Sequence, residues 1–224
     1  MRGCATVATA VGGVLMVGGC SVGAEPFEPA GAEASAGRER ARTLTGDLLA
    51  RASADLPVLA STVLDGCVTG QSNWKRRDSF AHACSLVDSR VVVLAADEED
   101  VAATLTAYDD VLEGAGCRPR EGGGLDGIRE EYWSPGNPEV AARGAAGLPS
   151  ATYDCEEGVV LTVQPTSARE DERDPRTALG PPAPGDQVLA GRPHDEAALA
   201  ALRDSGAALA AVVSATRGYY RTTF

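Results

Sequence analysis

Two segments of the chain carry apolar residues at the spacing of an amphipathic helix. In the first, between residues 38 and 57, these residues are Ala41, Leu44, Leu48 and Ala52. In the second, they are Val101, Leu105, Tyr108 and Leu112. Pro57 ends the first predicted helix and Gly114 ends the second. Asp97, with Asp100 three residues later, is predicted to cap the start of the second helix.

Between these helices lie two runs rich in strand formers, 61–74 and 79–95, around a short polar centre. If the chain turns about the pair at 75 and 76, facing residues have numbers that sum to 151. Cys67 and Cys84 satisfy that sum, which favours a disulfide bond across a β-hairpin. The uninterrupted apolar run 91–94 is typical of a central strand that is covered on both faces.

A similar order of elements is predicted in the second half of the chain. Residues 128–134 and 151–165 are predicted to form a second strand pair, joined by a loop at 135–150 that is rich in Gly, Pro and Ala. The apolar run 159–163 matches the earlier run at 91–94. A charged, Pro-rich connector follows at 166–193.

The C-terminal segment allows two interpretations. Leu199, Leu202, Leu209 and Val213 could lie on one long helix. We predict instead a helix over 195–205 that Gly206 ends, followed by a strand, because the Val, Tyr and Thr pairs near the end favour extended structure.

The predicted elements follow the order α-ββα-ββα-β in a single domain over 38–224. This order indicates an α+β fold, a two-layer sandwich whose helices cover one face of a largely antiparallel sheet. From Leu86 onward, the order β-α-β-β-α-β is that of a ferredoxin-like unit. The order of elements implies no particular function.

The N-terminal residues have the pattern of a secretory signal. Arg2 is followed by a run without charge over 4–17, which is shorter than the roughly 20 apolar residues that span a bilayer. The sequence VGGC at 17–20 resembles the lipobox of bacterial lipoproteins, where the cysteine becomes the first mature residue and carries lipid. An ordinary signal peptide or a buried N-terminal helix are the alternatives.

The resemblance implies that residues 1–19 are a signal peptide and that Cys20 is the site of lipid attachment, outside the cytoplasm. Residues 20–37 have the small, polar and Pro-containing composition of a flexible tether. Removal of the signal takes away Arg2 and no acid, which leaves 19 basic and 32 acidic residues and a formal charge of −13. Nucleic acid and anionic headgroups repel such a chain, so membrane contact is expected through the lipid.

Four cysteines remain in the domain: Cys67, Cys84, Cys117 and Cys155. An even number of cysteines in an oxidising compartment indicates two disulfide bonds. The absence of C-x-x-C disfavours a zinc ribbon or a thioredoxin-type redox pair. If Cys67 pairs with Cys84, Cys117 and Cys155 form the other bridge.

No catalytic constellation is recognisable in the sequence. The G-x-S-x-G motif of serine hydrolases is absent from the domain over 38–224, and the two histidines, His82 and His194, lack zinc spacing. His82 lies two residues from Cys84, but a disulfide would remove the thiolate. Three acidic pairs could serve acid and base chemistry: Asp109/Asp110, Glu130/Glu131 and Glu156/Glu157. The acids at 97–100 and in the connector are interpreted as solvated or helix-terminal charge, so no metal or cofactor site is predicted.

These observations favour a non-catalytic envelope lipoprotein that binds a protein or a peptide. Tyrosine and tryptophan are frequent interface anchors and aromatic residues are scarce in this chain. The predicted interaction surface therefore consists of Tyr132, Trp133, Tyr219 and Tyr220. The alternatives are a small-ligand or cation-binding lipoprotein and an envelope hydrolase that uses paired carboxylates.

Overall fold

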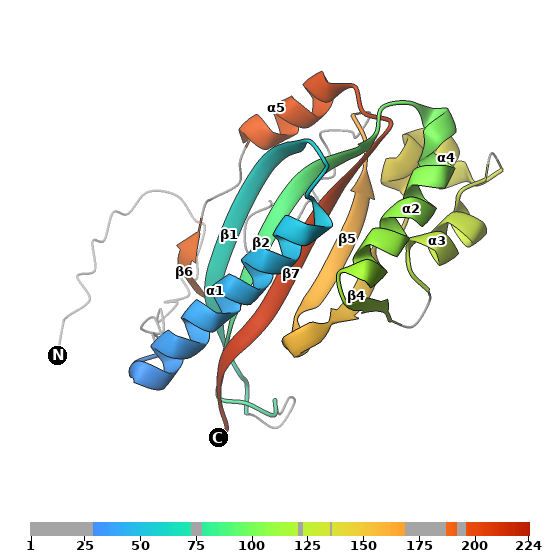
Figure 1. The fold of residues 1–224 in the computed structure, drawn as a ribbon. Helices are drawn as coiled ribbons and strands as arrows, with labels where there is room; N and C mark the ends of the chain where they lie inside the picture. Colours follow the sequence, from blue (N-terminus) through green and yellow to red (C-terminus); the bar gives the residue numbers. More distant parts are fainter. Residues whose placement is uncertain (1–28, 73–77, 121–122, 135, 169–186, 192–195) are drawn as a thin grey trace, which may run out of the picture.

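A computed structural model describes residues 29–72, 78–120, 123–134, 136–168, 187–191 and 196–224 (Figure 1). In this part of the chain, seven strands form one antiparallel sheet in the order β3-β4-β5-β7-β2-β1-β6. The strands are β1 (Val58–Thr69), β2 (His82–Ala95), β3 (Cys117–Pro119), β4 (Ala151–Cys155), β5 (Val160–Thr166), β6 (Gln187–Gly191) and β7 (Leu209–Thr222). The helices are α1 (Ala32–Ala52), α2 (Val101–Gly114), α3 (Leu125–Tyr132), α4 (Pro138–Arg143) and α5 (Glu196–Ser205). Short 3-10 turns lie at Glu98–Asp100, Gly144–Gly147 and Glu156–Gly158.

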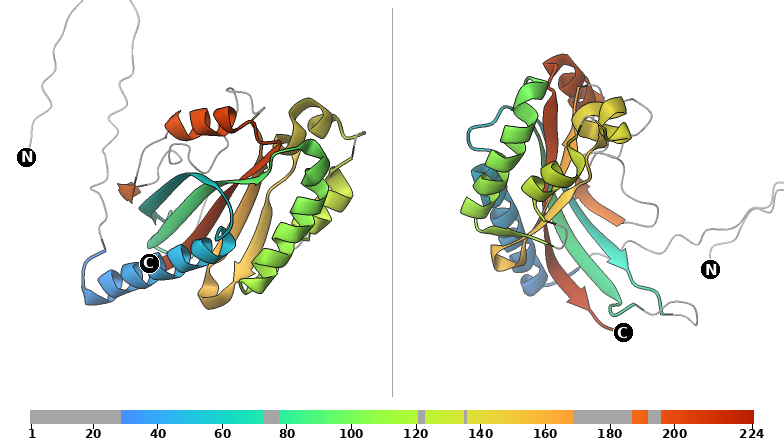
Figure 2. Two further views of the ribbon diagram at one scale, coloured as in Figure 1. Left: turned by 45° about the horizontal axis from the view of Figure 1, so that its top comes forward. Right: turned by 90° about the vertical axis from the view of Figure 1, so that its right-hand side faces the viewer.

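The main hydrophobic core lies between one face of the sheet and helices α1, α2 and α3 (Figure 2). Helix α5 packs on the other face, where Ala198 contacts Val91 and Val212. The α+β class with an antiparallel sheet is confirmed, but the helices do not all lie on one face. The reason is that β2 and β7 bury consecutive apolar residues, so both faces of the sheet need cover at that end.

The predicted hairpin register is confirmed. Cys67 faces Cys84 across β1 and β2, and the two residues form a disulfide bond. Cys117 on β3 faces Cys155 on β4 and forms the second bridge. Strand β2 pairs with β1 on one side and β7 on the other, so it is an inner strand as the apolar run predicted. The hairpin turn at 73–77 lies outside the described residues.

The predicted second strand pair is wrong in its first member. Residues 128–134 lie mostly in helix α3, and the loop 135–150 contains α4. The helix forms because Leu125 and Ile128, three residues apart, are both buried in the main core. Residues 151–165 are two strands, β4 and β5, rather than one, because the chain reverses at Glu157 and Gly158, which both have positive φ.

Two helix starts also differ from the predictions. Helix α1 begins at Ala32, so the tether assigned to 20–37 is shorter than predicted. Good helix formers dominate 32–36, and Ala34 is buried. Asp97 has extended backbone but makes no capping hydrogen bond with its side chain, and a 3-10 turn separates it from α2. The predicted capping box is therefore absent at this helix start.

The C-terminal segment is a helix followed by a strand, as predicted. Gly206 adopts φ of +65° directly after α5, a backbone conformation that favours glycine and ends the helix. Strand β7 then pairs with both β2 and β5 at the centre of the sheet. Strand β6 lies within the predicted connector and pairs with β1, which sequence reasoning missed. Among the described helices, none is long and apolar enough to cross a bilayer.

Gly37 sets how closely helix α1 approaches the sheet. A Cβ atom at this position would lie 2.8 Å from the Tyr219 carbonyl oxygen. We expect Gly37→Ala to lower the free energy of unfolding by about 1 kcal/mol, since the backbone contact outweighs the helix propensity that alanine adds. Gly114→Ala is the matched control, because a Cβ there meets nothing within 4 Å. Urea denaturation measures both, and equal stability of the two variants would contradict the prediction.

Candidate functional site

The four aromatic residues predicted to form one interaction surface lie in two separate places. Tyr132 ends α3 and is 37% exposed, and Trp133 packs partly buried against the main core. Tyr219 and Tyr220 lie near the end of β7, on the other side of the molecule (Figure 1). The structure therefore does not bring these residues together, and only Tyr132 remains exposed beside a pocket.

Tyr219 is part of an internal polar cluster that joins α1, β1 and β7. Its hydroxyl donates to Asp65 Oδ1 at 2.6 Å, and Arg38 Nε lies 2.9 Å from Asp65 Oδ2. The Arg38 guanidinium carbon also lies 5.5 Å from the centre of the Tyr219 ring. Burial, together with the hydrogen bond to Asp65, raises the pKa of Tyr219. This tyrosine holds the fold together and is not a free interface residue.

Asp109 is the one buried member of the three acidic pairs in the described residues. Its Oδ1 accepts a hydrogen bond of 2.5 Å from the Tyr153 hydroxyl, and its Oδ2 accepts one of 3.3 Å from the Asp126 amide. The same Tyr153 oxygen accepts the Leu125 amide at 2.8 Å. The neighbouring Asp110 is exposed, so the two carboxylates do not share a site. Asp109 therefore positions the start of α3.

The remaining candidate residues that the structure describes are either part of the fold or exposed to solvent. Within the described ranges, no three His, Cys, Asp or Glu side chains gather closely enough to hold a metal ion. The acids at 98–100 are exposed, as are Glu130/Glu131 and Glu156/Glu157. His82 Nδ1 lies 3.4 Å from the Thr69 hydroxyl, and the adjacent Cys84 sulfur belongs to a disulfide. His194 and the connector acids at 170–174 lie outside the described residues.

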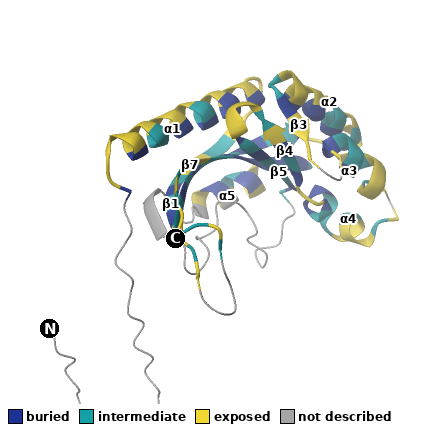
Figure 3. Cartoon of the chain, turned by 90° about the horizontal axis from the view of Figure 1, so that it is seen from below, coloured by how far each residue is buried: buried dark blue, intermediate teal, exposed yellow. Residues whose placement is uncertain are grey.

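A row of hydroxyl side chains crosses the sheet face opposite α1 and α2. Strand pairing places one hydroxyl residue in register on each of five neighbouring strands: Thr62, Ser89, Ser214, Thr162 and Thr152. Helix α5 lies on this concave side of the sheet (Figure 3). We call these five residues the hydroxyl row. It forms a continuous polar stripe across these five strands.

The hydroxyl row changes from buried to accessible along its length. Ser89 and Ser214 hydrogen-bond to each other at 2.9 Å, and the buried hydroxyl of Thr62 has no hydrogen-bond partner among the described residues. Thr162 and Thr152 are half-buried, and their hydroxyls make no hydrogen bond with the described residues. The same holds for the side-chain amide of Gln164, which follows Thr162 on the same face of β5. Donors and acceptors on β4 and β5 are therefore available to a ligand.

A pocket of about 490 Å³ lies at this accessible end of the row. Its lining includes Tyr132, Asn137, Glu139, Arg143, Gln164 and Pro165. Asn137 fixes the pocket wall, because its side chain accepts from the Glu139 amide at 3.0 Å and donates to the Tyr132 carbonyl at 2.9 Å. The pocket combines an aromatic ring, an amide and both signs of charge. We call the pocket together with Thr152 and Thr162 the candidate binding surface.

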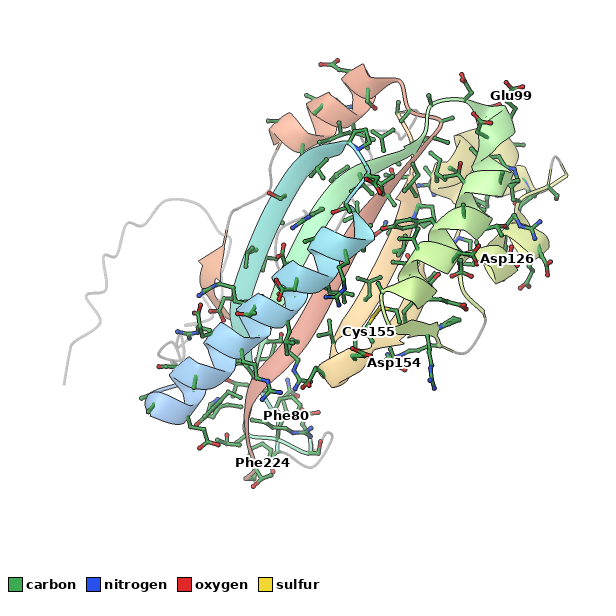
Figure 4. The ribbon with its side chains drawn as sticks, viewed as in Figure 1. Phe80, Glu99, Asp126, Asp154, Cys155 and Phe224 are labelled. Carbon is green, nitrogen blue, oxygen red and sulfur yellow. A yellow bond between two sulfur atoms is a disulfide. The ribbon has the colours of Figure 1, made fainter. Side chains whose placement is uncertain are left out.

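A second hollow, of about 720 Å³, lies at the β3 edge of the sheet around the Cys117–Cys155 disulfide. Asp154 and Cys155 mark its position beside α2 (Figure 4). Arg120 Nη2 lies 2.6 Å from Asp154 Oδ1, and this hydrogen bond is the main cause of the lowered pKa of Asp154. Asp154 is thus paired, whereas the other charged lining residues, Glu113, Arg118 and Glu156, form no ion pair among the described residues.

The available donors and acceptors, the exposed tyrosine and the wall held by Asn137 suit recognition of a polar ligand. Tyr132 is the one residue of the predicted surface that belongs to it. Sequence reasoning missed Thr152, Thr162 and Gln164, whose only signal is the alternation of polar and apolar residues at 151–154 and 160–164. Comparisons with protein-family models, with curated proteins and with solved structures find no match to this chain.

Proposed function

We propose that this protein is an extracytoplasmic bacterial lipoprotein, held on the cell membrane by lipid on Cys20, whose domain binds a protein or peptide of the cell envelope. The VGGC sequence at 17–20 supports the anchor. Two disulfides support an oxidising compartment, since such bonds are rare in the cytosol. The protein acts as a binding module rather than as an enzyme.

The observation that carries the proposal is the set of unpaired polar side chains beside the Tyr132 pocket. The Gln164 amide and the two threonine hydroxyls both donate and accept, which matches the alternating groups of a peptide main chain. Tyr132 offers a rigid aromatic contact of the kind that anchors protein interfaces. Glu139 lines the same pocket and provides a negative charge for a basic side chain.

The anchor is tested with Cys20→Ala in the bacterium. We expect the variant protein to leave the membrane fraction, or to accumulate as a precursor with its signal sequence, because the residue that carries lipid is gone. Fractionation and intact-mass measurement report the two outcomes. Normal processing together with unchanged membrane retention would refute the anchor.

The binding surface is tested by crosslinking in cells. A photo-crosslinking amino acid replaces Tyr132 in the full-length protein, and the same probe at Val111 is the control. Val111 is 46% exposed on the outer side of α2, away from the pocket. We expect one partner to be captured from position 132 and not from position 111.

A pocket-filling variant decides whether the capture depends on this surface. Gln164→Arg places a longer, charged side chain in the pocket, and we expect it to abolish the crosslink from position 132. The half-buried side chain of Gln164 lies outside the main core, so the fold should tolerate the change. Equal capture from positions 132 and 111, or capture that Gln164→Arg leaves unchanged, would reject the candidate binding surface.

A further inference from the structure

Exposed apolar side chains gather at the end of the domain where α1 begins. Phe224 is 62% exposed and Val68 is 36% exposed. Phe80 is half-buried and lies close to Phe224 at the bottom of the molecule in Figure 4. Two phenylalanines and a valine in one place form an apolar surface of the kind that marks an interaction site.

Three chain segments that are distant in sequence form this end. The hairpin of β1 and β2 is joined to the end of β7 by the Ala81 amide, which donates to the Thr222 carbonyl at 2.8 Å. The first turns of α1 lie against β7, where the backbone of Gly37 closely approaches that of Tyr219. The start of α1 and the phenylalanines therefore share one end of the domain.

Arg221 gives this end a cation beside its aromatic ring. Its guanidinium carbon lies 5.6 Å from the centre of the Phe80 ring, and Nη2 donates to the Ser79 hydroxyl at 2.6 Å. An arginine that extends over an apolar ring can keep its charge among headgroups while the ring enters the acyl boundary. Two other charges at this end are bonded within the domain, since Arg38 pairs with Asp65 and the Asp78 carboxylate accepts the Gln71 amide at 2.7 Å, while Glu33 in the first turn of α1 is exposed.

The chain geometry brings this end toward the lipid on Cys20. From Cys20 to Ala32 the chain can span at most about 40 Å, even if it is fully extended. Helix α1 has 21 residues and so extends about 30 Å away from this end. The phenylalanine end is therefore the part of the domain closest to the anchor, and the end that carries Glu99 is remote from it (Figure 4).

We propose that Phe80, Phe224, Val68 and Arg221 contact the bilayer surface and hold the anchored domain in one orientation. The proposal rests on the lipid attachment proposed above. Composition alone led us to expect membrane contact only through the lipid, because of the net negative charge. The four residues of this surface are apolar or cationic, in contrast to the net negative charge of the whole chain.

The test uses tryptophan probes in the full-length lipidated protein, reconstituted into phosphatidylcholine vesicles with brominated acyl chains. Bromine quenches a tryptophan only when the ring enters the bilayer. Phe224→Trp is the probe variant and Glu99→Trp is the matched control, because both positions are exposed and lie at opposite ends. The native protein is measured in parallel to subtract the fluorescence of Trp74 and Trp133.

We expect the fluorescence added by Phe224→Trp to be lost in brominated vesicles and that added by Glu99→Trp to be retained. Protein that sediments with the vesicles but shows no quenching at 224 would overturn the inference and leave the anchor intact. Equal quenching at both positions would also overturn it, because no single end would then face the bilayer. Protein that fails to sediment would overturn the proposed anchor, and this inference with it.

Discussion

Replacing Cys117 and Cys155 together with alanine is expected to lower the free energy of unfolding by about 4 kcal/mol. The bridge closes a loop with a sequence separation of 38, and without it the unfolded chain gains the entropy of that loop. The edge strand β3 makes only three residue pairs with β4, so little else holds it there. Equilibrium denaturation in urea under non-reducing conditions measures the change.

The Cys67–Cys84 bridge is the natural comparison. Its sequence separation is 17, so its removal is expected to lower the free energy of unfolding by about 3 kcal/mol. If the loss of packing decided the effect, removal of the Cys67–Cys84 bridge would cost more stability than removal of the Cys117–Cys155 bridge. Cys67 and Cys84 are both fully buried, whereas Cys155 is half-buried. A larger loss at the shorter loop would therefore show that burial, and not loop closure, dominates.

Asp109→Ala is expected to lower the free energy of unfolding by about 3 kcal/mol, because it leaves the buried Tyr153 hydroxyl and the Asp126 amide without their acceptor. Burial, and then the hydrogen bond to Asp109, raises the pKa of Tyr153, so its hydroxyl stays protonated and donates at neutral pH. Thermal and urea denaturation report the loss. We also expect faster amide hydrogen exchange in α3, which this carboxylate positions.

Asp110→Ala is the matched control, because the neighbouring carboxylate is exposed. Its removal should change the free energy of unfolding by no more than about 0.5 kcal/mol. Asp109→Asn should lose less stability than Asp109→Ala, since the amide oxygen can still accept from Tyr153. Equal losses at 109 and 110 would mean that the network around Tyr153 contributes no stability.

The hairpin of β1 and β2 could be predicted because residues close together in the sequence determine its strand pairing. The positions of Cys67 and Cys84 about a short polar turn define their pairing without knowledge of the rest of the chain. Helix α3 was not predictable from local sequence, because Tyr132 and Trp133 are residue types that favour strands. What makes the segment helical is remote in sequence: the core that buries Leu125 and Ile128, and the Asp109 carboxylate at the helix start.

Most of the candidate binding surface could likewise not be predicted from local sequence. Tyr132 could be selected because exposed aromatic residues are frequent in interfaces, but Trp133 and Tyr219 have the same composition signal and are engaged in the fold. Thr162 and Gln164 become a surface only through the pairing of β5 with β7. A local sequence pattern cannot predict the register of β5 with β7, because the connector at 166–193 separates the two strands in the sequence.

The central place of β7 also bears on when this chain can fold. Among the described strands, β7 alone joins the two halves of the sheet, because it pairs with β2 on one side and β5 on the other, and it follows all of these strands in the sequence. Contacts this distant in sequence form slowly. A growing chain that has not reached residue 222 lacks the strand that unites its sheet and cannot complete the core. For the exported lipoprotein that we propose, this order of synthesis would keep the precursor unfolded during export, and folding would be completed outside the cytoplasm, where the two disulfides can form.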